Sequence, residues 1–195
     1  MKKLKVYGVC FHGLLGNIYS RSMNTAAATL NAETPSGVHF DIVGGDDPDL
    51  ETGSIEANLD AAIAAGAVPI LIGHSLGADL ACREARRLKT KNIQIPIVVA
   101  VDPVDWDSNA NTLTQGRWEV DDNVGLVINP YQDCFPGGGS VYRAAGNTRT
   151  VIRQMHMPQY PHASLFGYDI GSCPETQRAI VTAVQTYVAS QREAA

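Results

Sequence analysis

The chain has 195 residues, of which 45% are hydrophobic and 18% charged, a composition that argues against a disordered or fibrous protein. The formal net charge is −5, and basic residues cluster only briefly within 83–91, which argues against nucleic acid as a partner. The length suits one domain with a substantial core and is short for two. We therefore expect a single domain over residues 1–195.

Strand-like and helix-like stretches alternate in the first half of the chain. Each strand-like stretch is rich in apolar and β-branched residues and is followed by turn-forming residues. The predicted strands are 4–11, 38–43 and 68–72. The predicted helices are 20–30, 54–65 and 76–89. Ser54 is a suitable N-cap for the second helix, and Gly66 ends it.

The alternation continues in the second half. The predicted strands there are 93–101, 124–128 and a short one at 150–152, and an amphipathic helix is predicted at 174–191. Such alternation predicts right-handed crossovers and an α/β fold with a mainly parallel sheet flanked by helices. Functional residues are then expected at the carboxyl ends of the strands.

A Gly-x-Ser-x-Gly pentapeptide, Gly73-His74-Ser75-Leu76-Gly77, lies between a predicted strand and a predicted helix. A sharp strand-to-helix turn lifts one side chain away from the backbone and leaves room only for small neighbours, here the two glycines. Ser75 is therefore the candidate nucleophile. The alternative interpretation is that Ser75 only caps the helix.

The pentapeptide resembles the nucleophile elbow of the α/β-hydrolase superfamily, and a second motif, His12-Gly13-Leu14-Leu15-Gly16, resembles its oxyanion loop. In that family the triad follows the chain order serine, acid, histidine. The resemblance implies a serine hydrolase in which Ser75 is activated by a histidine that is itself oriented by a carboxylate.

Two histidines follow Ser75 at a distance that suits this order. His162 lies in a loop before the last predicted helix, where the family places its base, and is our preferred candidate. His156 directly follows a predicted strand and is the alternative. The other three histidines lie too early in the chain and are interpreted as structural: His12, His39 and His74.

Two aspartates compete for the acid. Asp102 directly leaves the strand that follows the nucleophile helix, where a carboxylate is held rigidly, and it is preferred. Asp133 follows the next strand, which is the commoner location in the family, and it stays open.

Backbone N–H groups must meet the negative oxygen of a tetrahedral intermediate. The expected donors are Leu76, at the start of a helix, and Leu14, for which Gly13 or Leu15 could substitute.

Cofactor and metal sites are not expected. The glycines near position 13 lack the Gly-x-Gly-x-x-Gly spacing because Phe11 occupies the first position, and the Gly137-Gly138-Gly139-Ser140 stretch lacks the lysine of a phosphate-binding loop. No Cys-x-x-Cys or trusted metal-ligand spacing occurs. Whether Cys134 and Cys173 form a disulfide stays open.

A soluble, cytoplasmic protein is expected. No stretch approaches the roughly 20 apolar residues of a membrane span. The apolar stretch near the N-terminus is interrupted by Lys5, His12 and glycines, so we do not interpret it as a secretory signal.

The expected function is hydrolysis of carboxylic esters, with a small-molecule or lipid ester as substrate. About twenty residues separate Asp102 from the next strand, too few for a large helical lid, so an open site is expected. Trp106, Leu113 and Trp118 either line an acyl site or close the core. A thioesterase, an acyltransferase and a non-catalytic binding protein are the alternatives, and the oligomeric state stays open.

Overall fold

A computed structural model describes residues 4–13, 22–34, 37–43, 48–107, 112–134, 139–164 and 168–193. Its centre is a six-stranded, entirely parallel sheet in the order β10-β8-β4-β3-β1-β2. The strands are β1 (Val6–Phe11), β2 (Val38–Val43), β3 (Val68–His74), β4 (Ile95–Val101), β8 (Val124–Tyr131) and β10 (Val151–His156). The predicted α/β fold class is confirmed.

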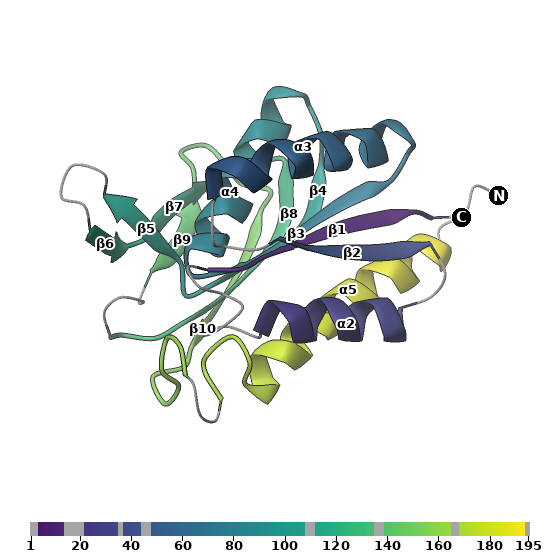
Figure 1. Cartoon of the computed structure of the whole chain (residues 1–195). Helices are drawn as coiled ribbons and strands as arrows, with labels where there is room; N and C mark the ends of the chain where they lie inside the picture. The colour runs from purple at the N-terminus through teal and green to yellow at the C-terminus, as the bar shows by residue number, and fades with distance from the viewer. Residues whose placement is uncertain are drawn as a thin grey trace.

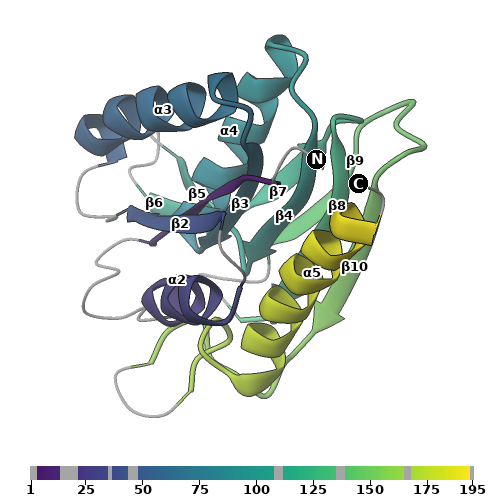
Figure 2. The same ribbon diagram turned by 90° about the vertical axis from the view of Figure 1, so that its right-hand side faces the viewer.

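In the described part of the chain, helices cover both faces of this sheet. One face carries α3 (Pro48–Ala64) and α4 (Leu76–Thr90), and the other carries α2 (Ser22–Glu33) and α5 (Pro174–Glu193) (Figure 1). Figure 2 shows α2 and α5 as neighbours beneath the sheet, where they contact one another. The carboxyl ends of the parallel strands therefore lie along one common edge of the sheet.

Alternating residues of the central strands build two separate cores. In β3, Ile70 and Ile72 join the core under α2 and α5, whereas Leu71 between them joins the core under α3 and α4. All three side chains are fully buried. This burial on both faces explains why β3 is a continuous apolar run rather than an alternating pattern.

The connection between β4 and β8 carries three further short strands. β5 (Val104–Asp107) and β6 (Thr112–Gln115) form an antiparallel hairpin, and β7 (Arg117–Val120) pairs in parallel with β9 (Ser140–Arg143). The described part of this connection contains no helix.

Trp118 belongs to the core rather than to a wall of the active site. Its side chain is buried in the cluster under α4, and the guanidinium of Arg83 lies 5.8 Å from its ring centroid. The side chains of Trp106 and Leu113 lie outside the described part of the structure.

Element boundaries differ from the predictions at several places. The helix predicted at 20–30 begins at Ser22 and continues to Glu33. The helix predicted from Ser54 begins at Pro48, because proline lacks the N–H that a first helical turn leaves unpaired anyway. Gly66, with a φ of +85°, lies just beyond its end, as predicted.

The strand predicted at 150–152 is the longer β10, which extends to His156, and the strand predicted at 124–128 is β8, which extends to Tyr131. The short strands β5, β6, β7 and β9 were not predicted. The four cysteines are free thiols, so Cys134 and Cys173 form no disulfide.

Candidate active site

Ser75 occupies a strained turn between β3 and α4. Its φ of 61° and ψ of −125° lie in a region that residues with a side chain rarely adopt. Its N–H donates to the Val101 carbonyl at 2.9 Å, and its own carbonyl accepts from Ala78 at 3.0 Å. These bonds fix the turn to the neighbouring strand and to the helix, so the surrounding structure maintains the strain.

The glycines on both sides of Ser75 are required by close backbone contacts. A Cβ atom on Gly73 would lie 2.0 Å from the Gly77 carbonyl oxygen, and one on Gly77 would lie 2.2 Å from the Phe11 carbonyl oxygen. Gly13 also approaches the turn, because a Cβ there would lie 2.7 Å from the Ser75 Cβ. The end of β1 therefore packs directly against the residue predicted as nucleophile.

Ser75, His162 and Asp102 form a continuous chain of hydrogen bonds. The His162 Nε2 lies 2.8 Å from the Ser75 Oγ, and its Nδ1 lies 2.7 Å from the Asp102 Oδ2. Because a carboxylate only accepts, Nδ1 carries the proton and Nε2 is left to accept from the serine hydroxyl. Asp102 is fully buried, whereas 13% of the His162 side chain is exposed. This arrangement can activate a serine.

Asp102 directly follows β4 and is fixed by one residue on β8 and one just after it. Its N–H donates to the Pro130 carbonyl at 2.7 Å, and its φ is 44°. Its carboxylate accepts from the Gln132 backbone N–H at 3.3 Å and from the Gln132 Nε2 at 2.9 Å. Gln132 was not anticipated from the sequence, since one amide residue after a strand forms no recognisable motif.

The alternative acid and the alternative base pair with each other instead. The Asp133 Oδ2 lies 2.7 Å from the His156 Nε2, and both side chains are exposed, at 63% and 48%. The His156 ring also stacks on Tyr131, with 5.1 Å between the ring centroids. This surface pair is separate from the chain of hydrogen bonds that includes Ser75.

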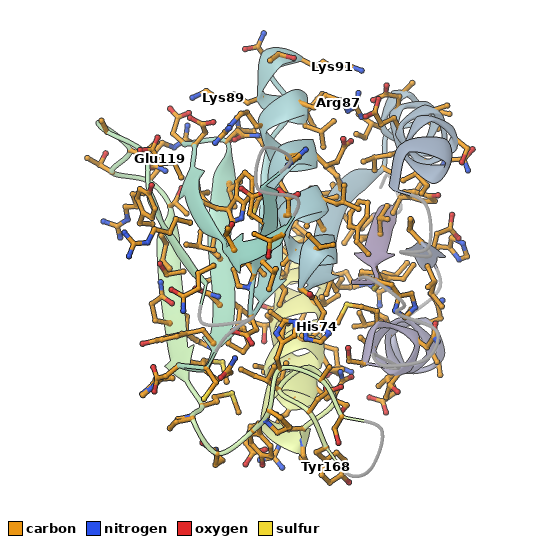
Figure 3. The ribbon with its side chains drawn as sticks, turned by 60° about the vertical axis from the view of Figure 1, so that its left-hand side comes forward. His74, Arg87, Lys89, Lys91, Glu119 and Tyr168 are labelled. Atoms are coloured by element: carbon orange, nitrogen blue, oxygen red, sulfur yellow. The ribbon has the colours of Figure 1, made fainter. Side chains whose placement is uncertain are left out.

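His74 is a buried neighbour of His162. Its Nε2 donates to the backbone carbonyl of His162 at 2.9 Å, and the two ring centroids lie 5.1 Å apart. Burial, together with the nearby His162 ring, lowers the pKa of His74 to about 4. His74 is therefore neutral near pH 7. His74 is the last residue of β3, and Figure 3 shows it between Arg87 above and Tyr168 below.

The expected oxyanion donors are only partly described. Leu76 is the first residue of α4, and the first N–H groups of a helix have no acceptor within the helix. Leu14 lies outside the described residues. His12, just before Gly13, is buried, and its Nε2 bonds to the Asn24 Oδ1 of α2 at 3.0 Å. This bond fastens the end of β1 where the oxyanion loop was predicted to begin.

The described ranges contain no cluster of three or more histidine, cysteine, aspartate or glutamate side chains that could hold a metal ion. Within the same ranges, no helix has both the length and the apolar character needed to cross a membrane.

The similarity of this chain to known proteins is seen in solved structures and not in sequence families. No protein-family model matches the sequence, and no curated protein matches it significantly. The RedJ thioesterase of the prodiginine pathway in Streptomyces coelicolor has a TM-score of 0.52 at 12% identity, covering 93% of this chain and 86% of its own.

Two other structures are similar to a comparable degree. A structure from the study of LipS and LipT, two metagenome-derived lipolytic enzymes, has a TM-score of 0.53 at 11% identity and covers 96% of this chain and 95% of its own. YbtT, a type II thioesterase of the yersiniabactin pathway, has a TM-score of 0.50 at 10% identity, with 96% of each chain covered. The chain therefore has the α/β-hydrolase fold.

Proposed function

We propose that this protein is a serine hydrolase that cleaves carboxylic esters through an acyl-enzyme intermediate. The proposal rests above all on the two hydrogen bonds that connect the Ser75 Oγ through the His162 ring to the buried Asp102 carboxylate. The strained Ser75 turn also supports it, since strain of this kind persists where a side chain must be presented in one orientation.

In the first half-reaction, the Ser75 Oγ attacks the ester carbonyl carbon while His162 Nε2 takes the hydroxyl proton. The imidazolium is stabilised by Asp102. The N–H of Leu76 and one from the loop after Gly13 stabilise the oxyanion, a contribution of about 3 to 4 kcal/mol per donor. The tetrahedral intermediate then collapses, and the alcohol leaves with the proton from His162.

In the second half-reaction, water attacks the acyl-serine ester. His162 Nε2 accepts a proton from the water, and the same two N–H donors stabilise the second oxyanion. Collapse of this intermediate releases the carboxylic acid, and the proton on His162 returns to the Ser75 oxygen. Short or medium acyl esters are the proposed substrates. Thioesters are the second candidate, because two of the structural neighbours are described as thioesterases and a thiolate leaves from the same intermediate.

A fluorophosphonate probe and a substrate series test this function together. Wild-type protein should be labelled and should release p-nitrophenol from a chain-length series of esters, with an acyl-thioester measured alongside. Ser75→Ala should abolish both labelling and turnover.

Ser190→Ala is the matched control, because the Ser190 Oγ lies on α5 and donates to the Tyr187 carbonyl one turn earlier in the same helix. It should keep full labelling and turnover. A wild-type protein that neither labels nor turns over any ester or thioester would contradict the proposal and favour a non-catalytic binding protein.

A further inference from the structure

We propose that Gln132 is a positioning residue that holds the Asp102 carboxylate in line with His162, an inference that rests on the proposed function. Gln132 directly follows β8, the strand beside β4 in the sheet, and only 2% of it is exposed. It makes two hydrogen bonds to the acid, from its backbone N–H to Oδ1 and from its Nε2 to Oδ2, at 3.3 and 2.9 Å.

The orientation of the Gln132 amide is determined by its other partners. Its Nε2 also donates to the Cys134 carbonyl at 2.6 Å, and its Oε1 accepts from the Cys134 N–H at 2.5 Å. Exchanging the amide oxygen and nitrogen would place the oxygen against two acceptors, the Asp102 carboxylate and the Cys134 carbonyl. The side chain therefore presents a donor to Asp102 in one fixed orientation.

The two donors of Gln132 affect both the rotation of the Asp102 carboxylate and its ionised form. Asp102 Oδ2 receives both the His162 Nδ1–H and the Gln132 Nε2–H, so the glutamine fixes the rotation of the carboxylate that faces the ring. Because Asp102 is fully buried, hydrogen bonds from donors are also what favours its ionised form there. Without Gln132, the carboxylate would lose two of its hydrogen bonds, and the oxygen that faces the His162 ring would be held less firmly.

Two substitutions separate this positioning role from simple packing. Gln132→Met has a similar length but no donor, so kcat should fall by about 10- to 100-fold, the range expected when an outer hydrogen-bond partner of a functional group is lost, with little change in KM. Gln132→Glu keeps the shape and can donate only while its carboxyl is protonated. Its activity should be close to wild type at low pH and should fall as the introduced carboxyl ionises.

Gln154 supplies the matched control. Its Nε2 donates to the Val141 carbonyl at 2.7 Å, on the same sheet but away from the acid. Gln154→Met and Gln154→Glu should leave both kcat and its pH profile unchanged.

The measurements are kcat and KM for a p-nitrophenyl ester from pH 5 to 9, the rate of fluorophosphonate labelling, and circular dichroism to show that each variant is folded. If Gln132→Met fails to fold, the pH profile of Gln132→Glu decides alone.

An active wild type whose Gln132→Glu variant has an unchanged pH profile, or whose folded Gln132→Met variant keeps full kcat, would overturn the positioning role and leave the proposed function standing. An inactive wild type would overturn both.

Discussion

The Asp102 carboxylate and the Asp133 carboxylate follow neighbouring strands, yet they have opposite environments. Asp102 is buried and bonds to the His162 ring at 2.7 Å, whereas Asp133 is exposed and bonds to His156. If Asp102 orients the base, Asp102→Asn should lower kcat on the order of 10⁴-fold, because the amide favours the wrong tautomer of the imidazole.

Asp133→Asn is the matched control, and its kcat should stay near that of wild type. Steady-state ester hydrolysis by the two variants measures the difference. Near-normal turnover of Asp102→Asn, with loss in Asp133→Asn, would reverse the assignment of the acid.

Burial of His74 makes stability depend on pH. Its pKa is about 4 in the folded protein and about 6.5 when unfolded, so between these values only the unfolded chain binds the proton. His74 therefore does not reduce the unfolding free energy above pH 6.5, where it is neutral in both states. As the pH falls from 6.5 toward 4, it lowers the unfolding free energy by roughly 3 kcal/mol.

A second buried group opposes this trend, because burial raises the pKa of Asp79 to about 6. An acid whose pKa is raised on folding destabilises the protein as pH rises from about 3.8 to 6. The wild-type curve therefore contains both effects with opposite signs, and only a comparison of variants separates them.

The comparison is urea unfolding of wild type and His74→Gln between pH 4.5 and 7. Glutamine can still donate to the His162 carbonyl, but it does not titrate. The stability difference between the two proteins should shift in favour of wild type as the pH rises. His39→Gln is the control, because it replaces an exposed histidine, paired with Asp41, instead of a buried one. A difference that stays constant with pH would contradict the buried, neutral state of His74.

At the scale of the elements, Arg87 joins two helices. Its guanidinium bonds to Glu84 on its own helix α4 at 2.5 and 2.7 Å and to Asp60 on α3 at 3.0 and 3.1 Å. Figure 3 shows Arg87 on the side of α4 that faces α3. These partners raise the pKa of Arg87, with the Glu84 hydrogen bonds as the largest cause.

Arg87→Met should therefore lower the unfolding free energy by about 1 to 3 kcal/mol, because it leaves the buried Glu84 without its cation. The control is Lys89→Met, since Lys89 is a more exposed cation on the same helix that pairs with Asp121 at 2.8 Å. It should change stability little. Urea unfolding at pH 7 measures both, and equal stability of Arg87→Met and wild type would contradict the prediction.

The elements that were predicted well are those with local signals. The apolar run of β3 and the stripe of α4 needed only neighbouring residues, and the same holds for the turn at Ser75, where Gly73 and Gly77 meet backbone directly. The part of α3 before Ser54 was not predicted, because several turn-forming residues precede Pro48. β10 was underestimated because an edge strand with mostly exposed residues has no hydrophobic period.

Long-range contacts explain what was left open in the site. Asp102 and Asp133 both follow strands, and only the position of the His162 loop distinguishes them. Gln132 was missed for the same reason, since its partner lies 30 residues earlier in the chain. The sequence therefore predicted the strand ends at which the candidate residues lie, but not the hydrogen bonds among them.

For the whole molecule, the hydrogen bonds of the candidate site also determine when activity can arise during folding. Ser75 and His162 are 87 positions apart, and His162 and Asp102 are 60 apart. Contacts this distant form late, because the entropy of closing long loops must be overcome before such contacts can stabilise the chain. Helical structure should therefore return early in refolding, whereas the proposed ester hydrolysis should return only with the slowest phase. Hydrolysis would then report that the parallel sheet is complete.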